Sequence, residues 1–135
     1  SAGVETSIAG LGVATYRIGG ANRFATAAMI ADFETADSSA TATTTGGLGF
    51  DSNSEGSETA FLATGLDFAD ALAGAPLAGG SGSPILLTNP TTLSPETMTW
   101  LSAHDANYST VIGLGLAGAV SNAALNAANA AVAGG

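Results

Sequence analysis

Two carboxylates three residues apart, Asp67 and Asp70, are the first candidates for chemistry in this sequence. A pair of this kind can exchange protons with a substrate or help to hold a metal ion. The same spacing also suits the start of a helix, where Asp67 would cap free amides and Asp70 would face the positive end of the helix dipole. Because no nucleophile, base or further metal ligand lies nearby in the sequence, we favour the capping role. An enzyme that uses the pair with a metal is the minor alternative.

A second acidic segment, D-S-N-S-E-G at residues 51–56, matches the opening of a calcium-binding loop. Its Asp51, Asn53 and Glu55 would supply the oxygen ligands. The acid that closes such a loop at about its twelfth position is replaced here by Leu62, so the pattern is incomplete. We therefore expect a solvated acidic loop and no required cofactor, with these three residues as weak candidates for binding Ca²⁺.

The glycines of residues 113–118, G-L-G-L-A-G, match a pattern that holds the pyrophosphate of a dinucleotide at the start of a helix. That fingerprint also needs a second strand, ending in an acidic residue about 20 residues later. No Asp or Glu follows Asp105 in this chain. We interpret the glycines as a tight connection between a strand and a helix.

Arg17 and Arg23 are the whole set of permanently cationic side chains, because the chain has no lysine. A guanidinium group can clamp a carboxylate or phosphate through two parallel hydrogen bonds. The two arginines flank the pair Gly19-Gly20, so both could face one edge of the domain. The alternative is that each forms a structural ion pair with an acidic residue of its own chain.

The composition limits the classes of partner. In a chain of 135 residues, eleven acidic residues oppose two basic ones, which gives a formal net charge of −9. Nucleic acids and anionic lipid surfaces are both bound through Lys and Arg, so the sequence argues against either partner. No apolar run approaches the ~18 residues of a membrane span. The absence of cysteine excludes disulfides, thiolate metal sites and a cysteine nucleophile.

Short apolar strands alternate with helices along the part of the chain that must position these residues. The pattern predicts strands at residues 15–18, 59–64, 84–88 and 109–112. It predicts helices at about residues 22–33, 68–78, 94–103 and 121–132, with Asn22, Asp67, Ser94 and Ser121 as the residues at their starts. A loose start over residues 1–14 and a long surface loop over residues 35–58 complete the chain.

Strands and helices that alternate with short connections favour a parallel sheet built from βαβ units. The strands are apolar throughout, as expected where helices cover both faces of a sheet. We therefore predict one domain over residues 1–135, of the α/β class, with a mostly parallel sheet between layers of helices.

Five segments, taken in order, resemble the cell wall binding repeat 2 family of bacterial surface proteins. They are R-I-G-G-A-N-R-F-A-T-A (17–27), A-T-G-L-D-F-A-D-A-L (63–72), A-P-L-A (75–78), P-I-L-L-T (84–88), and V-I-G leading to A-V-S (111–121). Together they cover about residues 15–132 and one repeat. Asn22 stands where the family tends to have Asp, a change that keeps the capping function.

The resemblance implies a Toprim-like or flavodoxin-like module, without catalysis, that anchors secreted bacterial proteins to the cell wall. Modules of the family usually occur as three tandem copies around a pseudo-three-fold axis. A single repeat therefore implies a homotrimer, or else a fragment of a longer protein or an engineered single module. The implied ligand is an anionic secondary wall glycan held in a groove between modules. The residues implied for binding it are Arg17, Arg23, Pro84, Ile85, Leu86 and Leu87.

The net charge of −9 opposes an anionic polymer, over a screening length of about 8–10 Å at physiological salt. Binding would then need arginines gathered around the groove, or divalent cations that bridge the two. The alternative function is a structural oligomerisation or surface-layer module with no affinity for glycan.

Overall fold

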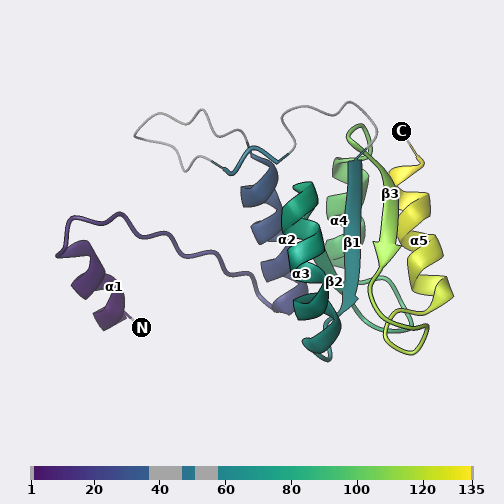
Figure 1. The fold of residues 1–135 in the computed structure, drawn as a ribbon, viewed down its shortest axis with the longest axis horizontal. Coiled ribbons are helices and arrows are strands. Elements are labelled where there is room, and N and C mark those ends of the chain that lie inside the picture. Colours follow the sequence, from purple (N-terminus) through teal and green to yellow (C-terminus); the bar gives the residue numbers. More distant parts are fainter. Residues whose placement is uncertain (1, 37–46, 51–57, 135) are drawn as a thin grey trace.

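A computed structural model describes residues 2–36, 47–50 and 58–134 (Figure 1). The weak calcium candidates Asp51, Asn53 and Glu55 lie outside the described residues, as does most of the loop expected over residues 35–58.

Three parallel strands form the centre of the described chain, in the order β2-β1-β3. In the central strand, Phe61 is paired with Ile85 on one side and Ile112 on the other. The elements follow one another as α1 (Ala2–Ala9), α2 (Arg23–Thr35), β1 (Glu58–Thr64), α3 (Ala69–Ser81), β2 (Ile85–Thr88), α4 (Pro95–Ala103), β3 (Tyr108–Gly113) and α5 (Asn122–Val132). The predicted three-layer α/β class is confirmed.

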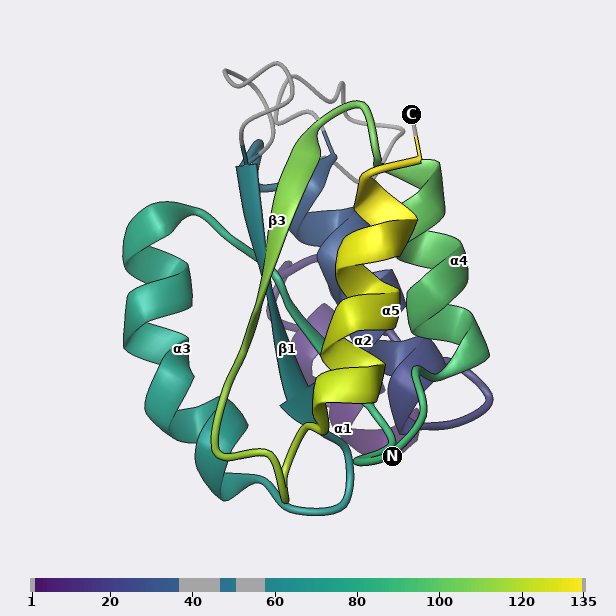
Figure 2. The same cartoon turned by 90° about the vertical axis from the view of Figure 1, so that its right-hand side faces the viewer.

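The two faces of the sheet are covered unequally (Figure 2). Helices α2, α4 and α5 pack on one face, and α3 covers the other. The main core lies on the three-helix side and includes Leu62, Leu86, Trp100 and Val111. On the other side, Phe61 of β1 is also buried. Alternation of side chains along β1 explains why adjacent residues enter different layers.

Two helices begin at the predicted caps. The Asn22 side chain accepts a hydrogen bond from the Ala25 amide at 2.9 Å, at the start of α2. The Ser121 hydroxyl accepts one from the Ala124 amide at 3.2 Å, at the start of α5. In both cases a short polar side chain satisfies an amide that has no partner within the helix.

The prediction for α3 was wrong at both ends. Its N-cap is Phe68, and Asp67 instead accepts a hydrogen bond from the Ala69 amide at 3.2 Å, in a turn that precedes the helix. The helix also continues past the expected stop at Ala78. It ends at Gly82, whose φ of 65° is the left-handed conformation that glycine adopts without steric penalty.

The strand expected at residues 15–18 is also absent from the described sheet; residues 13–20 form no regular element. A strand needs a neighbour with free backbone groups, and side chains already bond to both outer strands. The Asn129 amide accepts from Val111 N–H at 2.9 Å and donates to Val111 C=O at 3.0 Å. At the opposite edge, the Thr97 hydroxyl donates to the Leu87 carbonyl at 2.5 Å.

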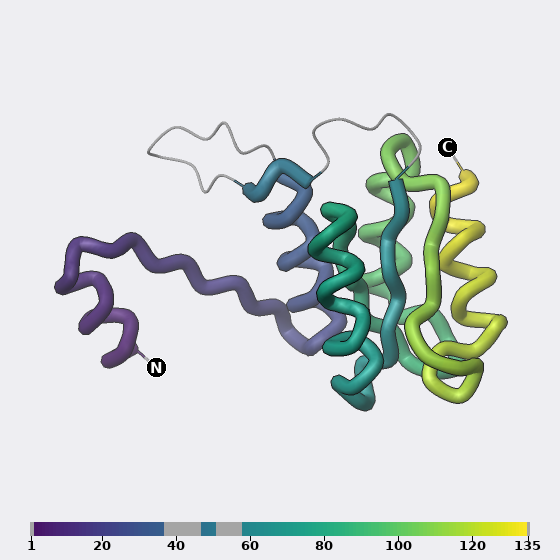
Figure 3. The backbone as a smooth tube through the Cα atoms, in the orientation of Figure 1, coloured from purple at the N-terminus to yellow at the C-terminus, as the bar shows by residue number. Residues whose placement is uncertain are grey.

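Residues 2–20, here called the arm, extend away from the remainder of the described residues, here called the body (Figure 3). The arm consists of α1, a turn at residues 10–12 and the irregular segment that leads to α2. Helix α1 has no buried residue.

Candidate functional site

The carboxyl ends of the three parallel strands form the candidate site, here called the carboxyl edge. The chain leaves β1 toward α3 on one face, and leaves β2 and β3 toward α4 and α5 on the other. In open parallel sheets, ligands bind where neighbouring connections diverge in this way, because the divergence opens a crevice. The sheet topology therefore directs attention to the segment that follows Thr64.

A shallow pocket of about 410 Å³ opens at the carboxyl edge. It brings a cation, a carboxylate and several apolar side chains together from α2, β2 and the connection after β1. Those used below are Arg23, Gly65, Leu66, Asp67, Phe68 and Leu87.

Arg23 is the first residue of α2, and its guanidinium donates a hydrogen bond to the Gly65 carbonyl. Gly65 is buried against the start of α2, and a Cβ there would lie 2.4 Å from Cε1 of Phe24. The glycine thus lets α2 approach closely enough for Arg23 to reach over the end of β1. Among the described residues no carboxylate forms an ion pair with Arg23, so its remaining N–H groups can serve a ligand.

A second pocket, of about 390 Å³, adjoins the first and shares Thr64, Leu66 and Asp67 with it. It also contains Asp70, so the carboxyl edge brings the predicted carboxylate pair together. Asp70 lies against the loop after β3, where Gly115 has a φ of 91° and a Cβ would approach the carboxylate to 2.4 Å. Within the described ranges, no three His, Cys, Asp or Glu side chains are grouped to hold a metal ion.

The glycine-rich connection after β3 is separated from the following helix. Helix α5 starts at Asn122, four positions after Gly118. At its start the Ala124 amide, which has no partner within the helix, donates to the Ser121 hydroxyl. The Ser121 amide itself donates to the Pro90 carbonyl at 2.7 Å. The glycines therefore form a connection between β3 and α5, as predicted, rather than a phosphate-binding loop at the start of the helix.

The two arginines do not share one pocket. Arg17 lies on the arm and forms an ion pair with Glu5 at 2.9 Å, although 66% of its side chain is exposed. The hydrogen bond and charge of Glu5 raise the pKa of Arg17. The structural ion pair considered for both arginines is thus found for Arg17, and only Arg23 lies at the carboxyl edge.

The strand segment expected to bind ligand is divided between two environments. Pro84 and Leu86 are buried, and Leu86 belongs to the main core. Ile85 and Leu87 are only half-buried, and Leu87 lines the pocket with Arg23. Of the six implied binding residues, Arg23 and Leu87 are the two that the structure brings together.

Three exposed apolar side chains around the carboxyl edge were not predicted. Leu66, Phe68 and Leu116 are 67%, 76% and 86% exposed, respectively. The signal for the first two was present in the sequence, because apolar residues flank Asp67 directly after the glycine that ends β1. Large exposed apolar groups grouped around a pocket are typical of an interaction surface.

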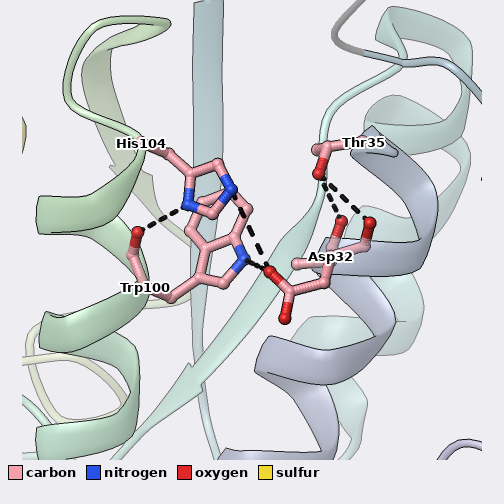
Figure 4. Close-up of polar contacts among 5 residues, drawn as sticks. Asp32, Thr35, Trp100 and His104 are labelled. Atoms are coloured by element: carbon pink, nitrogen blue, oxygen red, sulfur yellow. Dashed lines mark hydrogen bonds and ion pairs between the residues drawn. The ribbon is translucent and has the colours of Figure 1, made fainter. Parts of the chain in front are cut away.

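A polar cluster at the other end of the molecule fixes α2 against α4 (Figure 4). Trp100 Nε1 donates to Asp32 Oδ1 at 2.7 Å, and the His104 ring stacks on Trp100 with 4.0 Å between ring centroids. His104 lies just after the end of α4, with Nδ1 2.8 Å from the Trp100 carbonyl. The cluster holds the helix that carries Arg23.

The comparison with protein families gives a match over residues 17–125 to cell wall binding domain 2 (CWB2). No curated protein and no solved structure gives a significant match. None of the described helices is both long and apolar enough to cross a membrane. The matched span contains all three strands and both pockets of the carboxyl edge, whereas α1 lies before it. The chain therefore belongs to the cell wall binding domain 2 family, whose role is to bind the cell wall.

Proposed function

We propose that this protein is a secreted, non-catalytic module that binds an anionic secondary cell-wall glycan at the carboxyl edge. The observation that carries the proposal is the pocket that contains Arg23 with its apolar neighbours Leu66, Phe68 and Leu87. A guanidinium can donate two parallel hydrogen bonds to a carboxylate or phosphate on the polymer. The exposed ring of Phe68 and the leucines offer apolar contact to the carbon faces of the sugar rings.

The proposed site is completed by other copies of the chain. A single pocket of about 410 Å³ is shallow and carries one guanidinium in a chain of net charge −9. A homotrimer with its carboxyl edges around a common groove would gather three copies of Arg23. That concentration of positive charge would offset the repulsion between the acidic chain and an anionic polymer.

Divalent cations are the second way to offset this repulsion. Asp67 lines the same pocket as Arg23, and Asp70 lies in the adjoining one. Carboxylates from neighbouring copies and anionic groups of the glycan could share Ca²⁺, which is bound by oxygen ligands. We therefore expect glycan binding to respond to chelation if this mode contributes.

The decisive experiment compares Arg23→Ala with Arg17→Ala in a pull-down with purified secondary wall polymer, with and without EDTA. A charge-assisted hydrogen bond contributes about 1.5–3 kcal/mol, so Arg23→Ala should weaken binding by about 10- to 150-fold. Arg17→Ala is the matched control, because Arg17 is on the arm and paired with Glu5. Equal binding by wild type and Arg23→Ala would refute the proposed site. Self-association without any retention of glycan would favour the alternative, a structural surface-layer module.

A further inference from the structure

The α3 face of the sheet contains an open groove. Beside α3, the β3 side chains Thr110 and Ile112 are exposed, whereas Phe61 of the adjacent β1 is buried. The groove has a volume of about 440 Å³ and runs between Leu77 and Ser81 of α3 and Ile112 of β3. Among the described helices, α3 packs on this face, and α2, α4 and α5 pack on the opposite one.

Helix α1 lies outside the packed layers, and its side chains Val4 and Ile8 line a shallow hollow of about 410 Å³ with Tyr16 and Ile18 of the same arm. In α1, Val4 and Ile8 lie one turn apart and are 58% and 36% exposed, and Leu11, just beyond the helix, is 80% exposed. Residues with this spacing share one face of a helix. The arm therefore presents an apolar stripe that its own residues 15–18 cover only in part. The body presents a groove in which Leu77 and Ile112 are exposed apolar side chains.

We propose that α1 of one copy lies in the groove beside α3 of a second copy. The inference rests on the proposed assembly of copies and names the surfaces that join them. An eight-residue helix is about 12 Å long and about 10 Å across. The neighbouring strand β1, with seven residues, spans about 23 Å, so α1 fits along it. The tether at residues 13–20 reaches up to about 28 Å.

The charge distribution favours the arm over the body as the part that docks. Residues 1–20 contain one acid and one base, Glu5 and Arg17, which pair with each other. Residues 21–135 contain the other ten acids and one base, Arg23, and so carry the whole net charge of −9. Two bodies repel each other, whereas a neutral arm meets no such opposition.

This contact is heterologous, because the arm of one copy meets the groove of the next. Contacts of this kind form a ring when the rotation closes, and an open chain when it does not. Three copies in a ring would each give one arm and receive one, which leaves no apolar stripe or groove exposed. The proposed trimer would then have all of its equivalent surfaces covered.

The test uses light scattering on full-length variants with one defective surface each. The double substitution Val4→Asp and Ile8→Asp disables the arm, and Leu77→Asp disables the groove. The control is Met98→Asp, because Met98 is a comparably exposed apolar residue on α4. Wild type and control should have a mass of at least twice 12.9 kDa, the mass of one chain, and the two defective proteins should be monomers. Mixed together, these two should form a 1:1 dimer, because one retains its arm and the other its groove. That recovery also shows that both variants fold.

A monomeric wild type overturns the proposal, as do defective variants that keep the wild-type mass, or a mixture that stays monomeric. Because the chain has no cysteine, Ile8→Cys and Leu77→Cys in separate copies give a second test. The mixture should yield a disulfide-linked dimer, whereas a bond formed only within the double variant would show the arm folding onto its own body. Glycan retention is measured separately, so loss of glycan binding with intact arm docking refutes only the proposed function.

Discussion

Asn129→Ala tests how much the hydrogen bonds between the Asn129 side chain and the outer edge of β3 contribute to stability. The Asn129 side chain makes two hydrogen bonds to Val111, at 2.9 and 3.0 Å, and a third to the Leu125 carbonyl at 3.1 Å. Val111 is buried, so its backbone groups are poorly placed to bond to water instead. At about 1 kcal/mol for each net hydrogen bond, the two bonds to Val111 contribute about 2 kcal/mol.

The substitution also changes helix propensity in the opposite direction. Alanine is favoured over asparagine within a helix by about 0.5 kcal/mol, so Asn129→Ala should destabilise the protein by about 1.5 kcal/mol. Asn126→Ala is the matched control, because Asn126 is exposed on the same helix and has the same gain in propensity. The two variants should therefore differ by the full value of the lost bonds, about 2 kcal/mol.

Urea unfolding followed by circular dichroism measures both free energies of unfolding. The melting temperature should fall by about 6 °C for Asn129→Ala and rise by about 2 °C for Asn126→Ala, at about 4 °C for each kcal/mol. The reasoning is wrong if the two variants differ by less than about 0.5 kcal/mol, which is within the ordinary range of surface substitutions. Such a result would mean that water replaces the Asn129 amide at the edge.

Three further substitutions test local electrostatics and packing. Burial raises the pKa of Glu34, so the wild type loses stability as the pH rises through that raised folded-state pKa. Glu34→Gln should therefore raise the melting temperature at pH 7. It should also remove the gain in stability that the wild type shows at low pH. The Asn22 side chain donates to Glu96 at 2.7 Å and lowers the pKa of that carboxyl. Asn22→Ser keeps a helix cap but loses this donor, so the pKa of Glu96 should rise in a carboxyl NMR titration. An unchanged pKa contradicts the assignment. Gly65→Ala should destabilise by about 1–3 kcal/mol because the new methyl overlaps the packed start of α2, whereas Gly79→Ala, with open space around its Cβ position, should be neutral or stabilising in the same unfolding assay.

The sequence predicted the parts of the fold that depend on local pattern. Apolar runs correctly indicated the positions of β1, β2 and β3. The burial on both faces that such runs suggest is found along β1, whereas Ile112 of β3 is exposed beside α3. Asn22 and Ser121 marked helix starts, since their capping bonds reach only three residues along the chain. These signals are contained within a few neighbouring residues.

Features that depend on distant partners were predicted poorly. The segment at residues 15–18 has the alternation of a strand. Nothing in the sequence around it indicates that Asn129 and Thr97 already bond to the outer strands. Asn129 looks like any other asparagine in an alanine-rich helix. Arg17 and Arg23 were placed together because they are close in sequence. Arg17 instead pairs with Glu5, twelve residues earlier, and Arg23 bonds to the Gly65 carbonyl, so the two lie on different surfaces.

The candidate site was predicted in part for the same reason. Asp67 and Asp70 do meet at one pocket, because three residues of separation determine their proximity. The pairing of Arg23 with Leu87 depended instead on the resemblance to a family, and the sheet brings them to the same pocket from different elements. The open groove beside α3 left no local trace, because it depends on how the described helices divide between the two faces of the sheet.

The side chains that bond to the outer strands also limit how the molecule can polymerise. Amyloid growth and strand donation between proteins both begin when an incoming chain bonds to the unsatisfied edge of a sheet. Here an asparagine amide engages Val111 and a threonine hydroxyl engages Leu87, so an incoming strand would first have to displace them. These bonds thereby oppose the fusion of sheets into fibres in a protein whose family binds the cell wall.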